Sequence, residues 1–148
     1  MILELDDVAA TESLGATLWQ RLPEKSLVFL NGELGAGKTT LVRGVLRAAG
    51  YQGAVKSPTF TLVEEYEIAE RKILHFDLYR ISDPEELEWI GIDDYMAQKS
   101  LCFIEWAQLG EGVLPCPDLI LTLTLQGQKR LAQLLPVSQN GQKVIQPQ

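Results

Sequence analysis

The chain has 148 residues, of which 46% are hydrophobic and 22% are charged. These values match the averages of globular proteins and suit one domain, so they exclude an intrinsically disordered chain. The formal net charge is −7, and the 13 basic residues are scattered without a run of Lys or Arg. Such a chain lacks the basic face that unaided binding of nucleic acid requires.

The expected location follows from the apolar segments and from the first residues. No apolar stretch is long enough to span a bilayer. Residues 1–7 are acidic, whereas a secretory signal begins with basic residues. The two cysteines, Cys102 and Cys116, lack the spacing of metal ligands or of a disulfide framework. We therefore expect a cytoplasmic protein that does not contact a membrane.

The first half of the chain predicts a helix, a strand and a second helix. Residues 11–21 place leucines at helical spacing, with Thr11 as the predicted N-cap. Residues 27–30 are continuously apolar, as in a strand that is buried on both faces of a parallel sheet. Residues 41–49 carry the apolar stripe of a helix that ends at Gly50.

The second half of the chain predicts mostly strands. The expected elements are a hairpin of strands 60–66 and 72–78, a short acidic helix 84–87, a buried strand 101–106, and a final pair of strands 119–125 and 130–137. Trp89 and Ile90 are assigned to the core. This order predicts an α/β fold with a mixed β-sheet flanked by helices. One domain covers residues 1–137, and residues 138–148 form a polar, frayed tail.

Residues 32–39, Gly-Glu-Leu-Gly-Ala-Gly-Lys-Thr, match the phosphate-binding P-loop pattern, between a buried strand and an amphipathic helix. Glycines let the backbone curl so that successive N–H groups point at phosphate oxygens, and the following helix adds its positive N-terminus. The predicted nucleotide-binding residues here are Gly35, Ala36, Gly37, Lys38, Thr39 and Thr40. Lys38 would reach the outer phosphates and Thr39 would coordinate Mg²⁺.

A P-loop also needs a carboxylate at the end of a neighbouring buried strand. Asp77 and Glu105 both follow apolar strands and both qualify. Either could hold Mg²⁺ while the other orients the attacking water. The residues alone leave that division open, as they leave open the simpler interpretation that one of the two is a solvated acid.

Four segments together resemble the TsaE family. They are Gly-Glu-Leu-Gly-Ala-Gly-Lys-Thr-Thr (32–40), Ser-Pro-Thr-Phe-Thr-Leu (57–62), His-Phe-Asp-Leu-Tyr-Arg (75–80) and Glu-Trp-Ala (105–107). The resemblance covers residues 11–135 and is more specific than the P-loop alone. It implies a P-loop NTPase-like fold and an Mg²⁺-dependent ATPase. The implied partners are the TsaB–TsaD pair, which places threonylcarbamoyl on the adenosine next to the anticodon of ANN-decoding tRNAs. Contact with tRNA would then be indirect.

The resemblance also implies roles for individual residues. Thr39 and Glu105 would be Mg²⁺ ligands, and Asp77 would join Lys38 as a catalytic residue. Three further residues would contact the nucleotide or sense its γ-phosphate: Thr11, Thr59 and Trp106. Thr59 lies in a switch-like segment, where Pro58 holds the residue before it in an extended conformation.

Several residues keep two interpretations at this stage. Thr11 is either an N-cap or a nucleotide contact. His75 is a hydrogen-bonded structural residue or, less simply, a proton relay beside Asp77. Arg80 either pairs with an acid, such as Asp83 or one on a partner, or neutralises transition-state charge. Arg130 has no assigned role.

Rival functions are a P-loop kinase of a small metabolite and a nucleotide-dependent interaction module that does not hydrolyse ATP. A kinase usually carries a substrate domain and an Arg-rich lid, for which 148 residues leave little room. A GTPase is disfavoured because the Asn-Lys-x-Asp sequence that reads guanine is absent.

Overall fold

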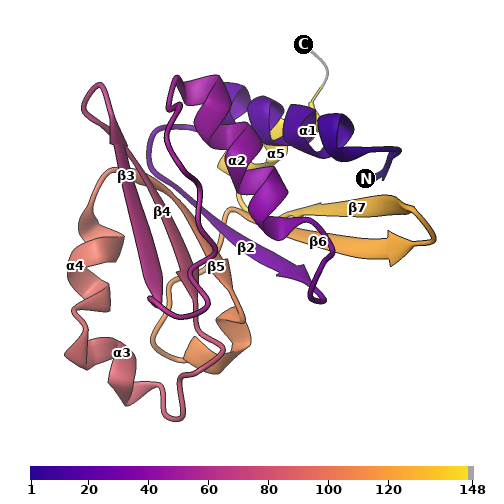
Figure 1. Ribbon diagram of the computed structural model, residues 1–148. Helices are drawn as coiled ribbons and strands as arrows, with labels where there is room; N and C mark the ends of the chain where they lie inside the picture. The colour runs from indigo at the N-terminus through magenta and orange to yellow at the C-terminus, as the bar shows by residue number, and fades with distance from the viewer. Residues whose placement is uncertain (147–148) are drawn as a thin grey trace.

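The computed structural model describes residues 1–146, which form a seven-stranded sheet with helices on both faces (Figure 1). The strands are β1 (Ile2–Leu5), β2 (Ser26–Gly32), β3 (Val63–Ile68), β4 (Arg71–Asp77), β5 (Ser100–Glu105), β6 (Leu119–Gln126) and β7 (Lys129–Pro136). The helices are α1 (Val8–Arg21), α2 (Lys38–Ala49), α3 (Glu85–Trp89), α4 (Ile92–Ala97) and α5 (Gln139–Ile145), with a 3₁₀ helix, η1, at Ala107–Gly110.

The strand order in the sheet is β1-β7-β6-β2-β5-β4-β3. The central strands β6, β2, β5 and β4 are parallel, while β7, β1 and β3 pair antiparallel toward the edges. The predicted α/β fold with a mixed sheet is therefore confirmed. Because β2, β4 and β5 run in the same direction, their carboxyl ends meet at one edge of the sheet, where ligands bind in open α/β folds.

Two hydrophobic clusters cover the two faces of the sheet. The cluster under α1, α2 and α5 includes Leu18, Val42 and Phe103. The cluster under α3, α4 and η1 includes Phe76 and Ile104. Side chains alternate between the faces along a strand, so odd-numbered residues of β4 and β5 face the helix α2. His75, Asp77 and Glu105 therefore share that face.

The helices α1 and α2 pack unusually closely, and two glycines permit it. A Cβ atom at Gly15 would overlap the carbonyl oxygen of Leu41. A Cβ atom at Gly44 would likewise overlap the carbonyl oxygen of Glu12. The packing also places Thr11, in the first half of α1, beside Gly37 at the start of α2, where a Cβ atom would lie 3.7 Å from the Thr11 side chain.

The predicted N-cap of the first helix is wrong. Helix α1 begins at Val8, and its N-cap is Asp7, whose Oδ1 accepts a hydrogen bond of 2.8 Å from the backbone N–H of Ala10. Thr11 lies one turn inside the helix and is 3% exposed. Thr and Asp are both favourable N-cap residues. The spacing of apolar residues that suggested Thr11 does not show at which residue the first turn of the helix begins.

The other corrections concern residues at the surface. The hairpin begins at Val63, because residues 60–62 lie in a turn that precedes the strand. Trp89 is 81% exposed and does not belong to the core, whereas Ile90 is partly buried and packs against the core cluster under α3 and α4. Neither β1 nor α4 was predicted.

The predicted frayed tail is also wrong for the residues that the structure describes. Residues 139–145 form α5, which Ser138 caps by accepting a hydrogen bond from the N–H of Gly141. Val144 is 3% exposed and belongs to the cluster beneath α1. A polar composition concealed this helix because one apolar turn is enough to dock it. The predicted tail also includes residues 147–148, which lie outside the described residues.

Within residues 1–146, no helix has the length and hydrophobicity needed to cross a membrane. Cys102 is buried in the sheet, and burial raises the pKa of its thiol. Cys116 is exposed.

Candidate functional site

A cavity of about 540 Å³ opens at the carboxyl ends of β2, β4 and β5. It is the place that the parallel strand order predicts for a ligand. Its lining comes from the loop 32–37, the start of α2, the segment 57–59 and the ends of β4 and β5: Gly32, Glu33, Leu34, Gly35, Gly37, Lys38, Thr39, Thr40, Ser57, Thr59, Asp77, Tyr79, Glu105 and Trp106.

The loop 32–37, called the glycine loop below, joins β2 directly to α2. Gly35 and Gly37 have φ angles of 83° and 104°, in the left-handed region that favours glycine. Gly37 is the N-cap of α2 and no side chain caps this end of the helix. The first N–H groups of α2 are therefore available beside the cavity, where the helix dipole favours an anion.

Lys38 is held by two oxygen atoms. Its Nζ lies 3.1 Å from Oε1 of Glu105, and it also donates a hydrogen bond to the carbonyl oxygen of Gly32. Both side chains are nearly buried, with exposed fractions of 13% for Lys38 and 6% for Glu105. Because this ion pair is shielded from water, removal of either side chain would leave the other charge buried without a partner.

Glu105 ends β5 and contacts two partners with its two oxygens. Oε1 faces Lys38, and Oε2 lies 2.6 Å from Nε2 of His75. Burial raises the pKa of Glu105, but the hydrogen bond to His75 and the charge of Lys38 together hold that pKa below its usual value. The carboxylate is consequently ionised at neutral pH.

Asp77 ends β4 and stands opposite Glu105 in register. It is 6% exposed, and its Oδ1 accepts a hydrogen bond of 2.9 Å from the backbone N–H of Tyr79. Its own backbone N–H donates to the carbonyl oxygen of Leu62 at 2.9 Å. The second bond ties the strand end to the segment that follows Pro58.

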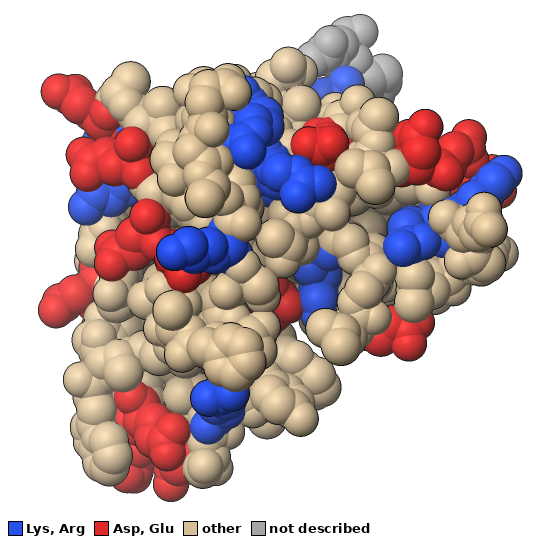
Figure 2. Space-filling view, in the orientation of Figure 1, with Lys and Arg blue, Asp and Glu red and all other residues tan. Residues whose placement is uncertain are grey.

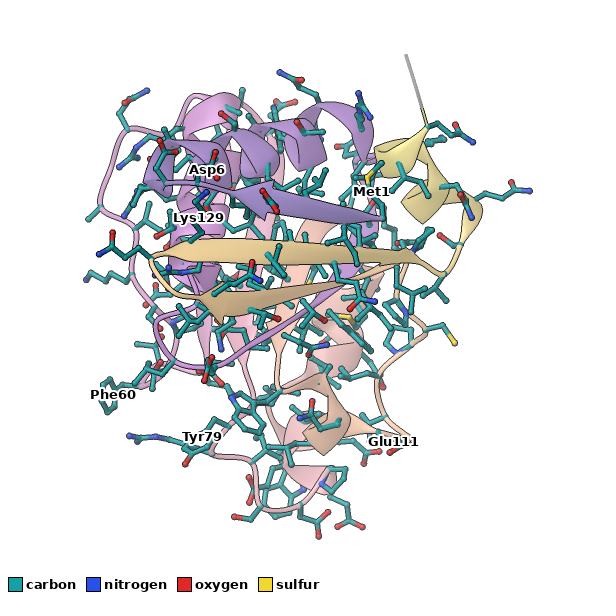
Figure 3. All side chains as sticks on the ribbon, turned by 90° about the vertical axis from the view of Figure 1, so that its right-hand side faces the viewer. Met1, Asp6, Phe60, Tyr79, Glu111 and Lys129 are labelled. Carbon is teal, nitrogen blue, oxygen red and sulfur yellow. The ribbon has the colours of Figure 1, made fainter. Side chains whose placement is uncertain are left out.

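Residues 57–62, which include the predicted switch-like segment 57–61, form a turn at the mouth of the cavity. The N–H of Leu62 donates to the carbonyl oxygen of Pro58 at 2.9 Å, and the hydroxyls of Ser57 and Thr59 share a hydrogen bond of 2.8 Å. Phe60, at its tip, is 79% exposed. Figure 3 shows Phe60 and Tyr79 projecting outward on the same side of the molecule.

Arg80 lies over the Phe60 ring, with its guanidinium carbon 4.6 Å from the ring centroid. Arg80 takes part in this cation–π contact and in none of the ion pairs of residues 1–146, so the structure lacks the pairing with Asp83 that was one of its predicted roles. Pairing with an acid on a partner and neutralisation of transition-state charge stay predictions.

Trp106 follows Glu105 with a φ angle of 58°, a left-handed conformation that is unusual for a bulky residue. Its ring lies 5.2 Å from that of Tyr79, and both residues line the cavity. Strain of this kind often accompanies functional sites, because surrounding structure must maintain it. Here it turns the chain sharply after the Glu105 carboxylate.

A second, smaller cavity of about 120 Å³ lies on the other side of the glycine loop. Thr11, Gly37 and Thr40 line it together with Gln128 and Arg130 from the hairpin of β6 and β7. A guanidinium nitrogen of Arg130 donates to the carbonyl oxygen of Gly35 at 3.2 Å. Beside it, Lys129 pairs with Asp6 at 3.4 Å, which connects the hairpin to the start of α1 (Figure 3).

The predicted site residues thus fall into three groups. Gly35, Gly37, Lys38, Thr39, Thr40, Thr59, Asp77, Glu105 and Trp106 line the larger cavity. Thr11 lines the smaller cavity, which also borders Gly35, Gly37 and Thr40. The side chain of Ala36 is fully buried beneath the loop, so this residue could offer a ligand only its backbone. Sequence reasoning did not assign a role to Arg130, and a single arginine at a turn carries no signal that would have found it.

The donors around the larger cavity fit Mg²⁺ bound to a phosphate chain. Among residues 1–146, no cluster of three or more His, Cys, Asp or Glu side chains could hold a metal by itself. Mg²⁺ rarely needs such a cage, because it keeps several waters and takes one or two protein oxygens together with substrate phosphates. Thr39 and the ionised Glu105 offer one hydroxyl and one carboxylate at the same cavity.

Sequence comparisons relate the chain to one family. The family model described as "Threonylcarbamoyl adenosine biosynthesis protein TsaE" matches residues 5–133. The tRNA threonylcarbamoyladenosine biosynthesis protein TsaE of Haemophilus influenzae is 52% identical over 119 residues, which are 80% of this chain and 75% of that protein. The protein of the same name from Aquifex aeolicus is 37% identical over 127 residues, which are 84% of this chain and 86% of that protein.

A solved structure shares the fold. The crystal structure of Bacillus subtilis YdiB superposes with a TM-score of 0.82 and covers 98% of this chain and 90% of that chain. The sequences are 24% identical, so this likeness establishes the fold alone. It is the P-loop NTPase-like arrangement of a mixed sheet and flanking helices that the sequence predicts.

Proposed function

Since this chain belongs to the TsaE family of threonylcarbamoyl adenosine biosynthesis proteins, we propose that it binds ATP with Mg²⁺ in the larger cavity and hydrolyses it. Hydrolysis would support the threonylcarbamoylation of tRNA. One observation carries the proposal: the glycine loop, the N-terminus of α2, Lys38 and two strand-end carboxylates all line one cavity.

The phosphate chain is assigned to the glycine loop. Backbone N–H groups of Gly35–Thr40 and the positive end of α2 would bind its oxygens. The base and ribose are assigned to the smaller cavity, because it borders the same loop and contains Thr11 and Arg130. Arg130 already donates a hydrogen bond to the loop at Gly35, and its remaining guanidinium N–H groups can donate hydrogen bonds to a nucleotide.

Lys38 would exchange partners when nucleotide binds. In the present structure its ammonium faces Glu105 and the carbonyl oxygen of Gly32. A γ-phosphate at the loop offers a stronger acceptor with more negative charge. Release of Lys38 frees Oε1 of Glu105, and this oxygen together with the hydroxyl of Thr39 would hold Mg²⁺. The bound ion would neutralise charge on the phosphates and on the leaving group.

Asp77 is assigned to the attacking water. It lies beside Glu105 at the strand ends, and one of its oxygens accepts a bond from Tyr79, which fixes the orientation of the carboxylate. The remaining oxygen can accept a proton or orient a water. Thr59 would sense the γ-phosphate, because it lines the cavity within a segment that is tied to the backbone of Asp77.

Docking to the TsaB–TsaD pair is assigned to the mouth of the cavity. Phe60, Tyr79 and Leu34 expose apolar surface there, with exposed fractions of 79%, 59% and 96%. Such a patch beside a nucleotide site suits a protein partner whose binding depends on the nucleotide. Lys and Arg side chains are interspersed with Asp and Glu on the face that Figure 2 shows, which supports indirect rather than direct contact with tRNA.

The test is release of phosphate from ATP with Mg²⁺, with and without TsaB–TsaD and with small-molecule acceptors. We expect the wild-type chain to release inorganic phosphate from ATP and the variant Lys38→Ala to release none. Transfer to an acceptor without free phosphate would indicate a kinase instead. Tight ATP binding without turnover, alone or with partners, would indicate a nucleotide-dependent interaction module.

A further inference from the structure

His75 occupies an unusual place for a histidine. It lies in the middle of the buried strand β4, has no exposed surface, and faces α2 among hydrophobic neighbours. In the register of β4 with β5 it stands opposite Phe103, two residues before the pair of Asp77 and Glu105. Side chains on one face of neighbouring strands reach diagonally across that distance. The diagonal partner of His75 is Glu105, at 2.6 Å.

We propose that His75 is a positioning residue, which donates its Nε2–H to Oε2 of Glu105 and so keeps Oε1 directed into the cavity. The inference rests on the proposed function, in which Oε1 of Glu105 takes part in holding Mg²⁺. His75 itself lies outside the lining of the cavity. It would act only through the carboxylate.

The two oxygens of Glu105 have separate partners, and this separation carries the proposal. Lys38 contacts Oε1 at 3.1 Å, and His75 contacts Oε2 at 2.6 Å. When Lys38 turns to the phosphates, His75 remains as the side chain that restrains the carboxylate among the contacts of residues 1–146. A carboxylate without such a restraint rotates about its last torsion, which is broad. The hydrogen bond with His75 prevents this rotation.

The hydrogen-bond inventory of His75 agrees with this role. An ionised carboxylate can only accept, so the proton in the contact must belong to Nε2. Nδ1 is buried and has no partner within the described chain. With the proton on Nε2, the group that lacks a hydrogen-bond partner is the lone pair of Nδ1 and not an N–H donor. Holding Glu105 therefore accounts for the one polar contact that a fully buried imidazole makes.

The first experiment observes the imidazole directly in the nucleotide-free protein. His75 is the only histidine of the chain, so its ring nitrogens give unambiguous signals in ¹H–¹⁵N spectra. We expect the Nε2–H tautomer, with an Nε2–H resonance that exchanges slowly with water. The variant Glu105→Ala should lose that resonance. The matched variant Asp77→Asn changes the neighbouring strand-end acid and should keep it. An Nδ1–H tautomer, or a resonance that survives Glu105→Ala, would overturn the assignment.

The second experiment measures the consequence for metal by calorimetry with a non-hydrolysable ATP analogue, with Mg²⁺ and with EDTA. His75→Gln keeps an N–H donor at the position of Nε2, whereas His75→Met keeps the length without a donor. We expect the gain in affinity that Mg²⁺ provides to fall about tenfold in His75→Met. The gain should stay within about threefold of wild type in His75→Gln, and affinity in EDTA should not change.

The two levels of the proposal fail differently. Absence of any Mg²⁺-dependent gain in the wild-type protein would contradict the proposed function. A normal gain in wild type that His75→Met retains would contradict the role of His75 and leave the proposed function standing. If His75→Met does not fold, as judged by circular dichroism, the tautomer of His75 and the loss of its Nε2–H resonance in Glu105→Ala decide the question.

Discussion

Asp77 and Glu105 lie opposite each other in register at the ends of adjacent parallel strands, yet they have different partners. Glu105 contacts Lys38 and His75 with its two oxygens. Asp77 accepts a hydrogen bond from the backbone of Tyr79 and is tied to Leu62 through its own N–H. Two acids at equivalent positions in the sheet therefore have different surroundings, and the proposed function gives them different tasks.

The first prediction separates these tasks. Asp77→Ala should lower kcat for ATP hydrolysis about 100-fold and leave nucleotide affinity nearly unchanged, because the proposed role of Asp77 is to orient the attacking water rather than to bind the nucleotide. Glu105→Ala should also weaken binding in the presence of Mg²⁺. Phosphate release and nucleotide titrations with and without Mg²⁺ check both variants. Identical behaviour of the two variants would show that the division of roles is wrong.

The second prediction concerns pH. The pKa of Glu105 is lower in the folded protein than its usual value, so the unfolded chain takes up the proton first as pH falls. The stability that this shift contributes is present above the ordinary carboxyl pKa of about 4.3 and is lost as pH falls through the lower folded value. Denaturant titrations in EDTA between about pH 6 and pH 3 should show a shallower loss of stability in Glu105→Gln than in wild type. Equal slopes would contradict a pKa of Glu105 that is lower in the folded protein than in the unfolded chain.

The third prediction concerns the contact of α1 with α2. Gly44→Ala should lower the free energy of unfolding by about 1–3 kcal/mol, because its Cβ would meet the backbone of Glu12. Alanine otherwise favours a helix, so a purely local effect would have the opposite sign. Ala48→Gln, an exposed change on the same helix, is the control and should stay within about 0.5 kcal/mol. A stabilised Gly44→Ala variant would show that the two helices are less closely packed.

The fourth prediction concerns α5. Gly141→Ala should reduce stability, because its Cβ would overlap the carbonyl oxygen of Asp118 and push the helix off β7. Lys143→Ala alters an exposed residue of the same helix and serves as the control. Thermal unfolding measures both variants. If α5 contributes nothing, neither substitution will move the melting temperature.

The fifth prediction concerns partners. Phe60→Ala should weaken docking to TsaB–TsaD about tenfold in the presence of ATP and leave ATP binding intact, since Phe60 points away from the body of the protein (Figure 3). Trp89→Ala removes an equally exposed aromatic ring from α3 and should have no effect. Pull-downs with ATP, ADP and no nucleotide measure docking, and gel shifts measure tRNA binding by the chain alone. Docking of equal strength with ATP, with ADP and without nucleotide would contradict the proposed docking. Tight binding of tRNA by the chain without its partners would also contradict it.

Much of the candidate site follows from local patterns in the sequence. The spacing of Gly35, Gly37 and Lys38 predicts a turn between a buried strand and a helix because glycine permits the left-handed backbone that this turn requires. Strand-end acids are equally visible, since apolar runs mark where buried strands end. These features depend on residues that are close together in the sequence, so the spacing of glycines and of apolar residues is enough to predict them.

Tertiary structure alone decided which of these groups touch. Thr11 and Arg130 reach the glycine loop from segments more than 90 residues apart in the chain, and only the packing of α1 and the β6–β7 hairpin brings them there. Glu105, rather than Asp77, receives His75 and Lys38 because β4 and β5 pair in one particular register. A shift of that register by one residue would turn His75 to the opposite face without altering any local pattern. The sequence by itself therefore determined the chemical groups of the site, and the pairing of strands some 30 residues apart determined their partners.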